Sequence, residues 1–256
     1  MTDLQARVNL LRQTKTNHLT QENLKNLDSA DVCPKCNGAE GYFYMVNEAE
    51  YWRDCECALQ RRSERLIQAS QITDSFRQMS FDNFNLDTVP LVVKQAFVTT
   101  YKYAKEFGAI RQQRSNGLCL LGRPGAGKTH LLMATANKLL SDGIKVVYFP
   151  WVEGCADLKS NFDSLADKIH RLQTVEVLYI DDLFKGRDKP TDFQREQIFG
   201  IINYRYLNRL PIMVSSEWTV AQMCVFDEAV GSRINEMCRE YKVVLDEEGL
   251  NYRLRD

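Results

Sequence analysis

The sequence predicts an α/β protein, in which a doubly wound parallel sheet follows a small N-terminal domain with helices and a zinc site. Three observations predict this fold class. Short apolar runs alternate with amphipathic helical segments, a glycine-rich loop joins one such run to the next helix, and four cysteines form two close pairs near the N-terminus. Alternating strands and helices build open parallel sheets that bind ligands at the carboxyl ends of their strands. We expect an N-terminal region at 1–75, with its cysteine module at about 31–58, and an α/β domain at 76–256.

The composition is typical of a globular protein without a membrane partner. The 256 residues, 44% hydrophobic and 26% charged, suffice for one mid-sized domain and a small one. No apolar run approaches the roughly 20 residues of a membrane span, and the N-terminus lacks the pattern of a signal peptide. A net charge of −1 means that any nucleic-acid contact needs a local basic patch. We expect a cytoplasmic protein whose eight cysteines are metal ligands or buried thiols rather than disulfides.

The glycine-rich loop fits the phosphate-binding pattern G-x-x-x-x-G-K-[S/T]. The apolar run 118–121 precedes it and the helical pattern 131–140 follows it, which is the order that this motif requires. Glycines let backbone N–H groups surround phosphates, and a helix N-terminus adds partial positive charge. Lys128 can reach the β- and γ-phosphates of ATP, and the Thr129 hydroxyl can bind Mg²⁺. The expected nucleotide-binding residues are Gly122, Arg123, Pro124, Gly125, Ala126, Gly127, Lys128, Thr129 and His130.

Two acids follow a second apolar run. Residues 175–180 are expected to form a strand, and Asp181 and Asp182 come at its carboxyl end, as in a Walker B motif. Asp181 would hold Mg²⁺ through water, and Asp182 lies where many such enzymes place a glutamate that orients the attacking water. An ordinary strand that runs into an acidic turn is the alternative. The phosphate-binding loop some fifty residues upstream favours the magnesium site.

The other segments of the α/β domain alternate between the two kinds of pattern. Further strands are expected at 145–149, 210–214 and 243–245. Helices are expected at about 90–112, 151–172, 191–209, with Thr191 as N-cap, and 227–239. The polar residues Ser215, Ser216 and Glu217 end one strand and would face the γ-phosphate. Phe81 and Phe84 are expected to pack at the domain edge, near the nucleotide base.

The paired cysteines have the spacing of a structural zinc site. Cys33 and Cys36 form C-x₂-C, and Cys55 and Cys57 form C-x-C. Four thiolates in two pairs suit tetrahedral Zn²⁺ and leave no open position for catalysis. Aromatic residues between the pairs suggest a small β-hairpin, namely Tyr42, Phe43, Tyr44, Tyr51 and Trp52. A module with so little core would take much of its folding energy from the metal. Four ordinary buried cysteines are the alternative.

Helical patterns flank the cysteine module. Leu4, Val8 and Leu11 share one face, which could bind a partner or pack on the rest of the N-terminal region. A second helix is expected after Thr20. Downstream, 58–70 reads as a helix with several arginines, and a solvated basic face is the default interpretation.

The string of motifs resembles the DnaC/DnaI family of replicative helicase loaders, including phage versions. These are AAA+ ATPases related to the initiator DnaA and the transposition helper IstB. In order, the motifs are Cys-Pro-Lys-Cys, Cys-Glu-Cys, Phe-Asp-Asn-Phe, the Walker A loop, Ile-Asp-Asp-Leu, Asn203-Tyr-Arg-Tyr206 and Gly231-Ser-Arg-Ile234. The resemblance covers nearly the whole chain, and the zinc module joined to the ATPase is similar to the DnaI arrangement. It implies an AAA+ sheet without a separate helical lid.

The resemblance also implies roles for individual residues. Arg233 matches the arginine finger that reaches a neighbouring subunit's γ-phosphate, although a helix-surface arginine is the simpler interpretation. Ser216 falls at the sensor-1 position, where the family usually has asparagine. Arg253 matches a late arginine that resembles sensor 2. Arg205 is expected either at the subunit interface or bound to an internal carboxylate.

The family's DNA contacts lie on elements after Walker B. Here that segment contains Phe184, which could stack on a base, and Lys185, Arg187 and Lys189, which suit backbone phosphates. A solvated basic loop is the alternative.

These features together predict a helicase loader. The zinc-bearing region would bind the replicative ring helicase, and the AAA+ domain would bind ATP, Mg²⁺ and single-stranded DNA and self-associate. Slow hydrolysis of ATP to ADP and phosphate is expected, because aspartate at position 182 is shorter than glutamate. The alternatives are an IstB-like transposition helper, against which the zinc module argues, and a nucleotide-gated adaptor with negligible hydrolysis.

Overall fold

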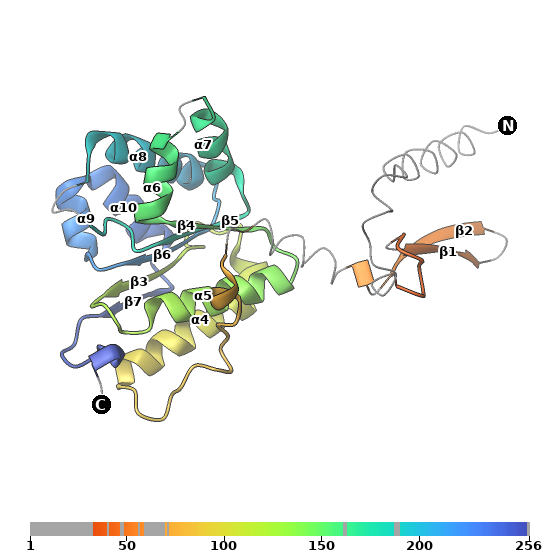
Figure 1. Cartoon of the computed structure of the whole chain (residues 1–256), viewed down its shortest axis with the longest axis horizontal. Coiled ribbons are helices and arrows are strands. Elements are labelled where there is room, and N and C mark those ends of the chain that lie inside the picture. The colour runs from red at the N-terminus through yellow and green to blue at the C-terminus, as the bar shows by residue number, and fades with distance from the viewer. Residues whose placement is uncertain are drawn as a thin grey trace. The chain divides into compact units, whose positions relative to one another are not determined.

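A computed structural model describes residues 33–39, 41–46, 49–55, 57–58, 70, 72–160, 163–186 and 190–254 (Figure 1). The chain divides into two compact units, residues 1–60 and 61–256. This division precedes the expected boundary after residue 75. The Ser70 carbonyl accepts a hydrogen bond from the Tyr148 N–H, and Ile72 is buried in the core of the second unit. The helices expected within 1–30 and 58–70 lie outside the described residues, apart from Ala58 and Ser70 at the ends of the second stretch.

The first unit contains the hairpin that the sequence predicts. Strands β1 (Gly41–Val46) and β2 (Ala49–Asp54) pair antiparallel, with Gly41 opposite Asp54. Aromatic and β-branched side chains favour such pairs because they pack across strands. Phe43 meets Trp52 edge to face, with ring centroids 4.9 Å apart. The hairpin brings the two ends that carry the cysteines together.

The second unit is built on a five-stranded parallel sheet with strand order β4-β5-β6-β3-β7. The strands are β3 (Leu118–Gly122), β4 (Val146–Pro150), β5 (Val177–Asp181), β6 (Ile212–Ser216) and β7 (Lys242–Leu245). Strand β3 lies between β6 and β7, so the glycine-rich loop follows a strand that has a neighbour on each side. The doubly wound parallel sheet expected from the sequence is confirmed.

Helices cover both faces of this sheet (Figure 1). They are α3 (Asp74–Arg77), α4 (Leu91–Ile110), α5 (Lys128–Ser141), α6 (Trp151–Ser160), α7 (Leu165–Thr174), α8 (Asp192–Leu207), α9 (Val220–Phe226) and α10 (Glu228–Met237). Two cores result. Leu118, Leu120 and Tyr179 face α4 and α5, whereas Cys119 and Leu121 face the core that contains residues of α6 to α10. This alternation follows from the period of two along a strand.

The helices agree with the sequence patterns, with three differences. The region 151–172 contains two helices, α6 and α7, and the short helices α3 and α9 were not predicted. Thr191 caps α8 as expected, since its hydroxyl accepts from the Gln194 N–H. Between β7 and residue 254 the structure describes only the 3₁₀ helix η2 (Tyr252–Leu254). Among the described residues, none of the helices has the length and apolar composition to cross a membrane.

Candidate nucleotide site and cysteine cluster

The glycine-rich loop has a backbone conformation that only glycine adopts freely. Gly122, Gly125 and Gly127 have φ values of +118°, +73° and +86°. A Cβ atom on Gly122 would lie 2.1 Å from the Leu245 carbonyl oxygen of the neighbouring strand β7. The spacing of these glycines therefore serves the tight turn that connects β3 to the N-terminus of α5, where backbone N–H groups can surround an anion.

Lys128 is the first residue of α5 and its ammonium turns back over the loop. Its Nζ donates to the carbonyls of Gly122 at 2.7 Å and Arg123 at 2.8 Å. Burial lowers the pKa of Lys128, whereas the carboxylates of Asp182 and Glu217 raise it. The cation thus lies where the loop can present it to phosphate oxygens, as predicted for this motif.

Asp181 ends β5 inside a shell of hydroxyl groups. Its Oδ1 accepts from Thr129 at 3.3 Å, Tyr179 at 2.8 Å and Ser215 at 2.5 Å, and its Oδ2 accepts from Tyr148 at 3.2 Å. Burial and the nearby Asp181 charge raise the pKa values of both tyrosines, so these phenols stay donors. The structure thus brings together Thr129 and Asp181, the two residues expected to hold Mg²⁺. Tyr148, Tyr179 and Ser215 were not predicted to support them.

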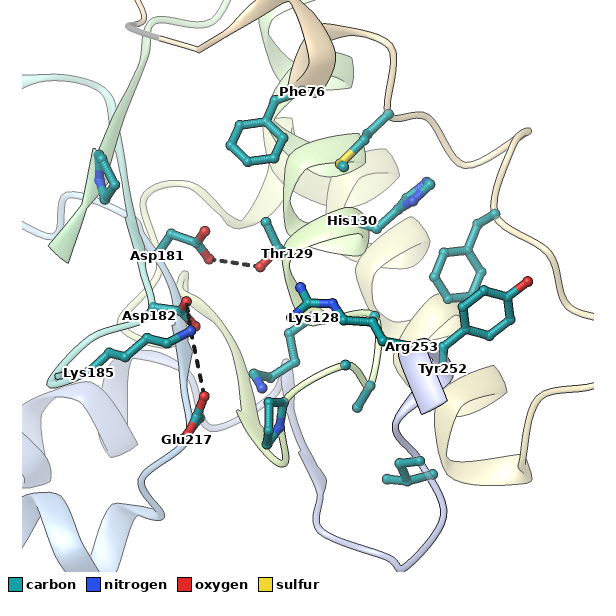
Figure 2. Close-up of a pocket in the computed structure, with 18 of the residues that line it drawn as sticks. Phe76, Lys128, Thr129, His130, Asp181, Asp182, Lys185, Glu217, Tyr252 and Arg253 are labelled. Atoms are coloured by element: carbon teal, nitrogen blue, oxygen red, sulfur yellow. Dashed lines mark hydrogen bonds and ion pairs between the residues drawn. The ribbon is translucent and has the colours of Figure 1, made fainter. Parts of the chain in front are cut away.

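Asp182 begins the turn that follows β5 and points into the same pocket (Figure 2). Its Oδ2 accepts from the Lys185 ammonium at 2.7 Å, and the same ammonium lies 3.7 Å from a carboxylate oxygen of Glu217. Figure 2 shows the Asp182, Lys185 and Glu217 side chains on one side of the pocket, facing Lys128. Oppositely charged groups therefore alternate where the end of a triphosphate would lie.

The pocket as a whole has a volume of about 950 Å³ and suits a nucleotide. Apolar and aromatic side chains also line it, namely Phe76, Met79, Phe84, Val89, Val93, Leu250 and Tyr252. His130 also lines it, and its Nε2 lies 3.0 Å from both the Ser80 carbonyl and the Asn83 side-chain oxygen. Arg253, on η2, which the family resemblance compares with a sensor-2 arginine, also lines the pocket. Phosphate-binding and apolar surfaces thus meet in one cavity.

The environments of Ser216, expected at the sensor-1 position, and of Phe184, expected to stack on a DNA base, do not suit those roles. The Ser216 hydroxyl donates to the Leu183 carbonyl at 2.6 Å and accepts from the Trp218 N–H at 3.0 Å, and Ser216 is fully buried. Alternation along β6 turns Ser215 instead toward Asp181, so Ser216 does not fit a sensor-1 role. Phe184 is 1% exposed, within 5.5 Å of the rings of Trp151, Trp218 and Phe226, so a base cannot stack on it.

Three basic residues after Walker B were predicted to contact DNA, and the structure describes one of them, Lys185. Lys185 lines the nucleotide pocket, as its two ion pairs show. Arg187 and Lys189 lie outside the described residues.

The two arginines singled out by the family resemblance occupy different environments. Arg233 lies on α10, donates to the Ala229 carbonyl at 2.8 Å, and its guanidinium is 5.2 Å from the Tyr206 ring. It does not line the pocket of its own chain. Arg205 is fully buried and donates to backbone carbonyls, so neither expected environment, a subunit interface or a carboxylate, is found.

The four cysteines of the first unit gather as the zinc prediction requires. Their sulfur atoms all lie within 4.8 Å of one another, with Cys33 and Cys55 3.8 Å apart and Cys36 and Cys57 3.3 Å apart. Tetrahedral Zn²⁺ with bonds of about 2.3 Å separates its sulfur ligands by about 3.8 Å. The backbone N–H of Lys35 lowers the pKa of the Cys33 thiol to about 7, whereas burial and the neighbouring thiols raise the pKa of Cys57 to about 12. Donor chemistry and spacing therefore fit a structural zinc ion.

Comparison with known proteins places these features in a family. The sequence profile described as "IstB-like ATP binding protein" matches residues 46–255. The phage-like element PBSX protein XkdC of Bacillus subtilis (strain 168) is 44% identical over 228 residues, which cover 87% of this chain and 86% of that protein. The replicative helicase loader DnaI of the same strain is 27% identical over 217 residues, which cover 77% of this chain and 66% of DnaI.

Solved structures give the same fold. The crystal structure of DnaI has a TM-score of 0.56 at 22% identity and covers 70% of this chain and 94% of that chain. The crystal structure of the DnaC helicase loader has a TM-score of 0.56 at 23% identity and covers 68% of this chain and 100% of that chain. The AAA+ P-loop fold and the resemblance to DnaC and DnaI expected from the sequence are therefore confirmed. Cys33 and Cys36 precede the residues that match the family profile.

Proposed function

Because the chain belongs to the family of IstB-like ATP-binding proteins, we propose that it is an ATP-dependent loader for a bacterial replicative ring helicase. The observation that carries this proposal is the combination of a nucleotide pocket in one unit with a four-cysteine hairpin in the other. The similarity to the loader DnaI over 77% of this chain supports it. The protein would work in the cytoplasm of a bacterium, and the similarity to a phage-element protein suits a prophage or phage origin.

The pocket would bind ATP with Mg²⁺, whose terminal phosphoryl group can be transferred to water. Lys128 and the loop N–H groups would bind the β- and γ-phosphates, and Thr129 and Asp181 would hold the metal, Asp181 through water. Asp182 would orient the water that attacks the γ-phosphorus, and the bond to the leaving oxygen of ADP would break. Since the Asp182 carboxylate is short and pairs with Lys185 at 2.7 Å, we expect slow turnover.

Self-association would complete the site. Arg233 does not line the pocket of its own chain, which suits a finger that reaches the γ-phosphate of a neighbouring subunit. Nucleotide binding and assembly would then depend on each other. Single-stranded DNA would bind through Arg187 and Lys189, whereas residues 1–75 with their zinc-bound cysteines would hold the helicase.

A loading assay tests the proposal directly. The full chain is mixed with the replicative helicase of its host, ATP, Mg²⁺ and circular single-stranded DNA, and helicase on the DNA is quantified. Lys128→Ala should lower ATP affinity by about 100-fold, because it removes charge-assisted hydrogen bonds. Arg233→Ala should lower kcat at least about 10³-fold while leaving ATP binding to the single chain unchanged.

Two outcomes would favour the alternatives. Turnover stimulated by a transposase and duplex DNA, with no binding of the helicase, would favour the transposition helper. Helicase binding that needs ATP but proceeds without turnover would favour the adaptor. Absence of helicase binding in the presence of ATP and single-stranded DNA would rule out the loader.

A further inference from the structure

The turn after β5 has a strained backbone that aims two side chains into the nucleotide pocket. Asp182 and Phe184 have φ values of +53° and +67°, although neither is glycine. The left-handed backbone region is unfavourable for residues that carry a Cβ atom. Strained residues persist where their surroundings fix them, and they concentrate at functional sites.

Contacts with the end of β6 and an aromatic cluster fix the turn. The Asp182 N–H donates to the Ser215 hydroxyl at 2.7 Å, and the Leu183 N–H donates to the Ser215 carbonyl at 2.8 Å. The buried Phe184 ring packs against Trp218 with centroids 4.9 Å apart. Because residues 183 and 184 are held in the interior, the turn presents Asp182 and Lys185 to the pocket.

Lys185 is a cation that the pocket itself holds. Its Nζ lies 2.7 Å from an oxygen of Asp182 and 3.7 Å from an oxygen of Glu217, and its side chain lines the pocket and is 45% exposed. The hydrogen bond to Asp182 raises the pKa of Lys185, so the charge is kept at neutral pH. Among the described residues, the other lysine and arginine side chains that line this pocket are Lys128 and Arg253. All three cations therefore converge on the space that phosphates would fill.

We propose that Lys185 binds the γ-phosphate of ATP, leaves Asp182 and Glu217 when it does so, and returns to them when only ADP is bound. This inference rests on the nucleotide-binding function proposed above. The γ-phosphate is a stronger anion than either carboxylate, whereas ADP offers nothing at that position. Lys185 thereby takes the nucleotide-sensing position that Ser216, bonded to the Leu183 carbonyl, does not occupy.

The same exchange would set the catalytic aspartate free. While Lys185 pairs with Asp182, one carboxylate oxygen is engaged at 2.7 Å. Movement of the ammonium to the γ-phosphate leaves that oxygen able to accept a hydrogen bond from water. Lys185 would thus couple recognition of ATP to the readiness of Asp182.

The test compares affinities for an ATP analogue and ADP in the full-length protein. Isothermal titration calorimetry with Mg²⁺ and the non-hydrolysable analogue AMPPNP gives one Kd, and ADP gives the other. Lys185→Met should weaken AMPPNP binding by about 10- to 100-fold, as expected for loss of a charge-assisted hydrogen bond, and change ADP binding by less than about twofold. Lys185→Arg should retain most of the preference for AMPPNP.

Lys138→Met is the matched control. Lys138 pairs with Asp142 at 2.6 Å on the exposed surface of α5 and does not line the pocket, so neither affinity should change. Glu217→Gln should change AMPPNP affinity in the direction opposite to Lys185→Met. Removing a competing carboxylate should strengthen AMPPNP binding about threefold relative to ADP, and this gain should vanish when Lys185→Met is also present.

The outcomes separate this inference from the proposed function. If Lys185→Met weakens binding of both nucleotides equally or of neither, while Lys128→Ala lowers the affinity about 100-fold, the inference is wrong and the nucleotide site stands. If wild-type protein binds neither AMPPNP nor ADP, both fail. If Lys185→Met leaves both affinities unchanged and weakens single-stranded DNA binding, Lys185 is a DNA contact instead.

Discussion

The cysteine hairpin, residues 33–58, and the α/β unit, residues 61–256, differ in how far their apolar side chains are buried. All five residues of β3 and of β5 are buried, whereas the hairpin exposes Tyr42, Phe43, Tyr44, Met45 and Tyr51. Apolar burial therefore stabilises the α/β unit. The described residues of the hairpin bury mainly cysteines, so we expect its fold to depend on zinc held by these four thiolates. We therefore expect side-chain packing to stabilise the α/β unit and metal ligation to stabilise the hairpin.

Removal of zinc should have the largest effect and should be confined to the hairpin. Structural zinc contributes about 10–16 kcal/mol to folding of small modules, so chelation or Cys36→Ser should unfold residues 33–58. Limited proteolysis and zinc content report on the hairpin, and AMPPNP affinity, which should stay within about twofold, reports on the α/β unit. Cys224→Ser, in α9 and outside the cluster, is the control. A hairpin that resists protease after complete zinc removal would contradict this comparison.

Loss of a buried arginine should be the next largest effect and should act only on the α/β unit. The Arg205 guanidinium donates to the backbone carbonyls of Leu172, Gln173, Val175, Glu176 and Pro211. Arg205→Met would leave these carbonyls short of donors and should cost about 3–5 kcal/mol in the free energy of unfolding. Urea denaturation measures it.

Arg209→Met is the matched control for that variant, because the Arg209 side chain is exposed on the same segment. It should change the free energy of unfolding by less than about 0.5 kcal/mol. Equal effects of the two variants would show that burial of Arg205 does not stabilise the fold.

The smallest effect should be a pH dependence at the surface of the α/β unit. Hydrogen bonds from Arg114 and Tyr206 lower the pKa of Glu236 below its ordinary value of 4.5. A carboxyl group with a lowered folded-state pKa adds stability above its unfolded pKa, and that stability is lost as pH falls through the folded value. Glu236→Gln should therefore flatten the decline in Tm below about pH 4.5, by little because exposed ion pairs are weak. If the decline in Tm at low pH were the same in Glu236→Gln as in the wild type, Glu236 would not contribute to this pH dependence.

The sequence was most informative where binding of a phosphate or a metal ion requires particular residue types at a fixed spacing. The glycines of the loop around Lys128, the acids after β5 and the cysteine pairs each have a spacing that few other structures need. Side chains that assist these groups from other strands carry no such spacing. Tyr148 and Ser215 reach Asp181 through the order of the strands, which a single sequence does not reveal. The alternation along β6 turns Ser215 toward Asp181, whereas the family resemblance pointed to Ser216.

The hydroxyl groups around Asp181 also favour the native register between β4 and β5. Tyr148 lies directly opposite Tyr179 in the pairing of β4 with β5, and both phenols donate to Asp181. A slip of one residue in this pairing would turn Tyr148 to the other face of the sheet. Asp181 would then lose a donor while its charge remained inside the protein. Ligands that bind only the correctly paired sheet stabilise it by mass action. ATP bound beside Asp181 would therefore favour chains in which β4 and β5 have paired in the native register.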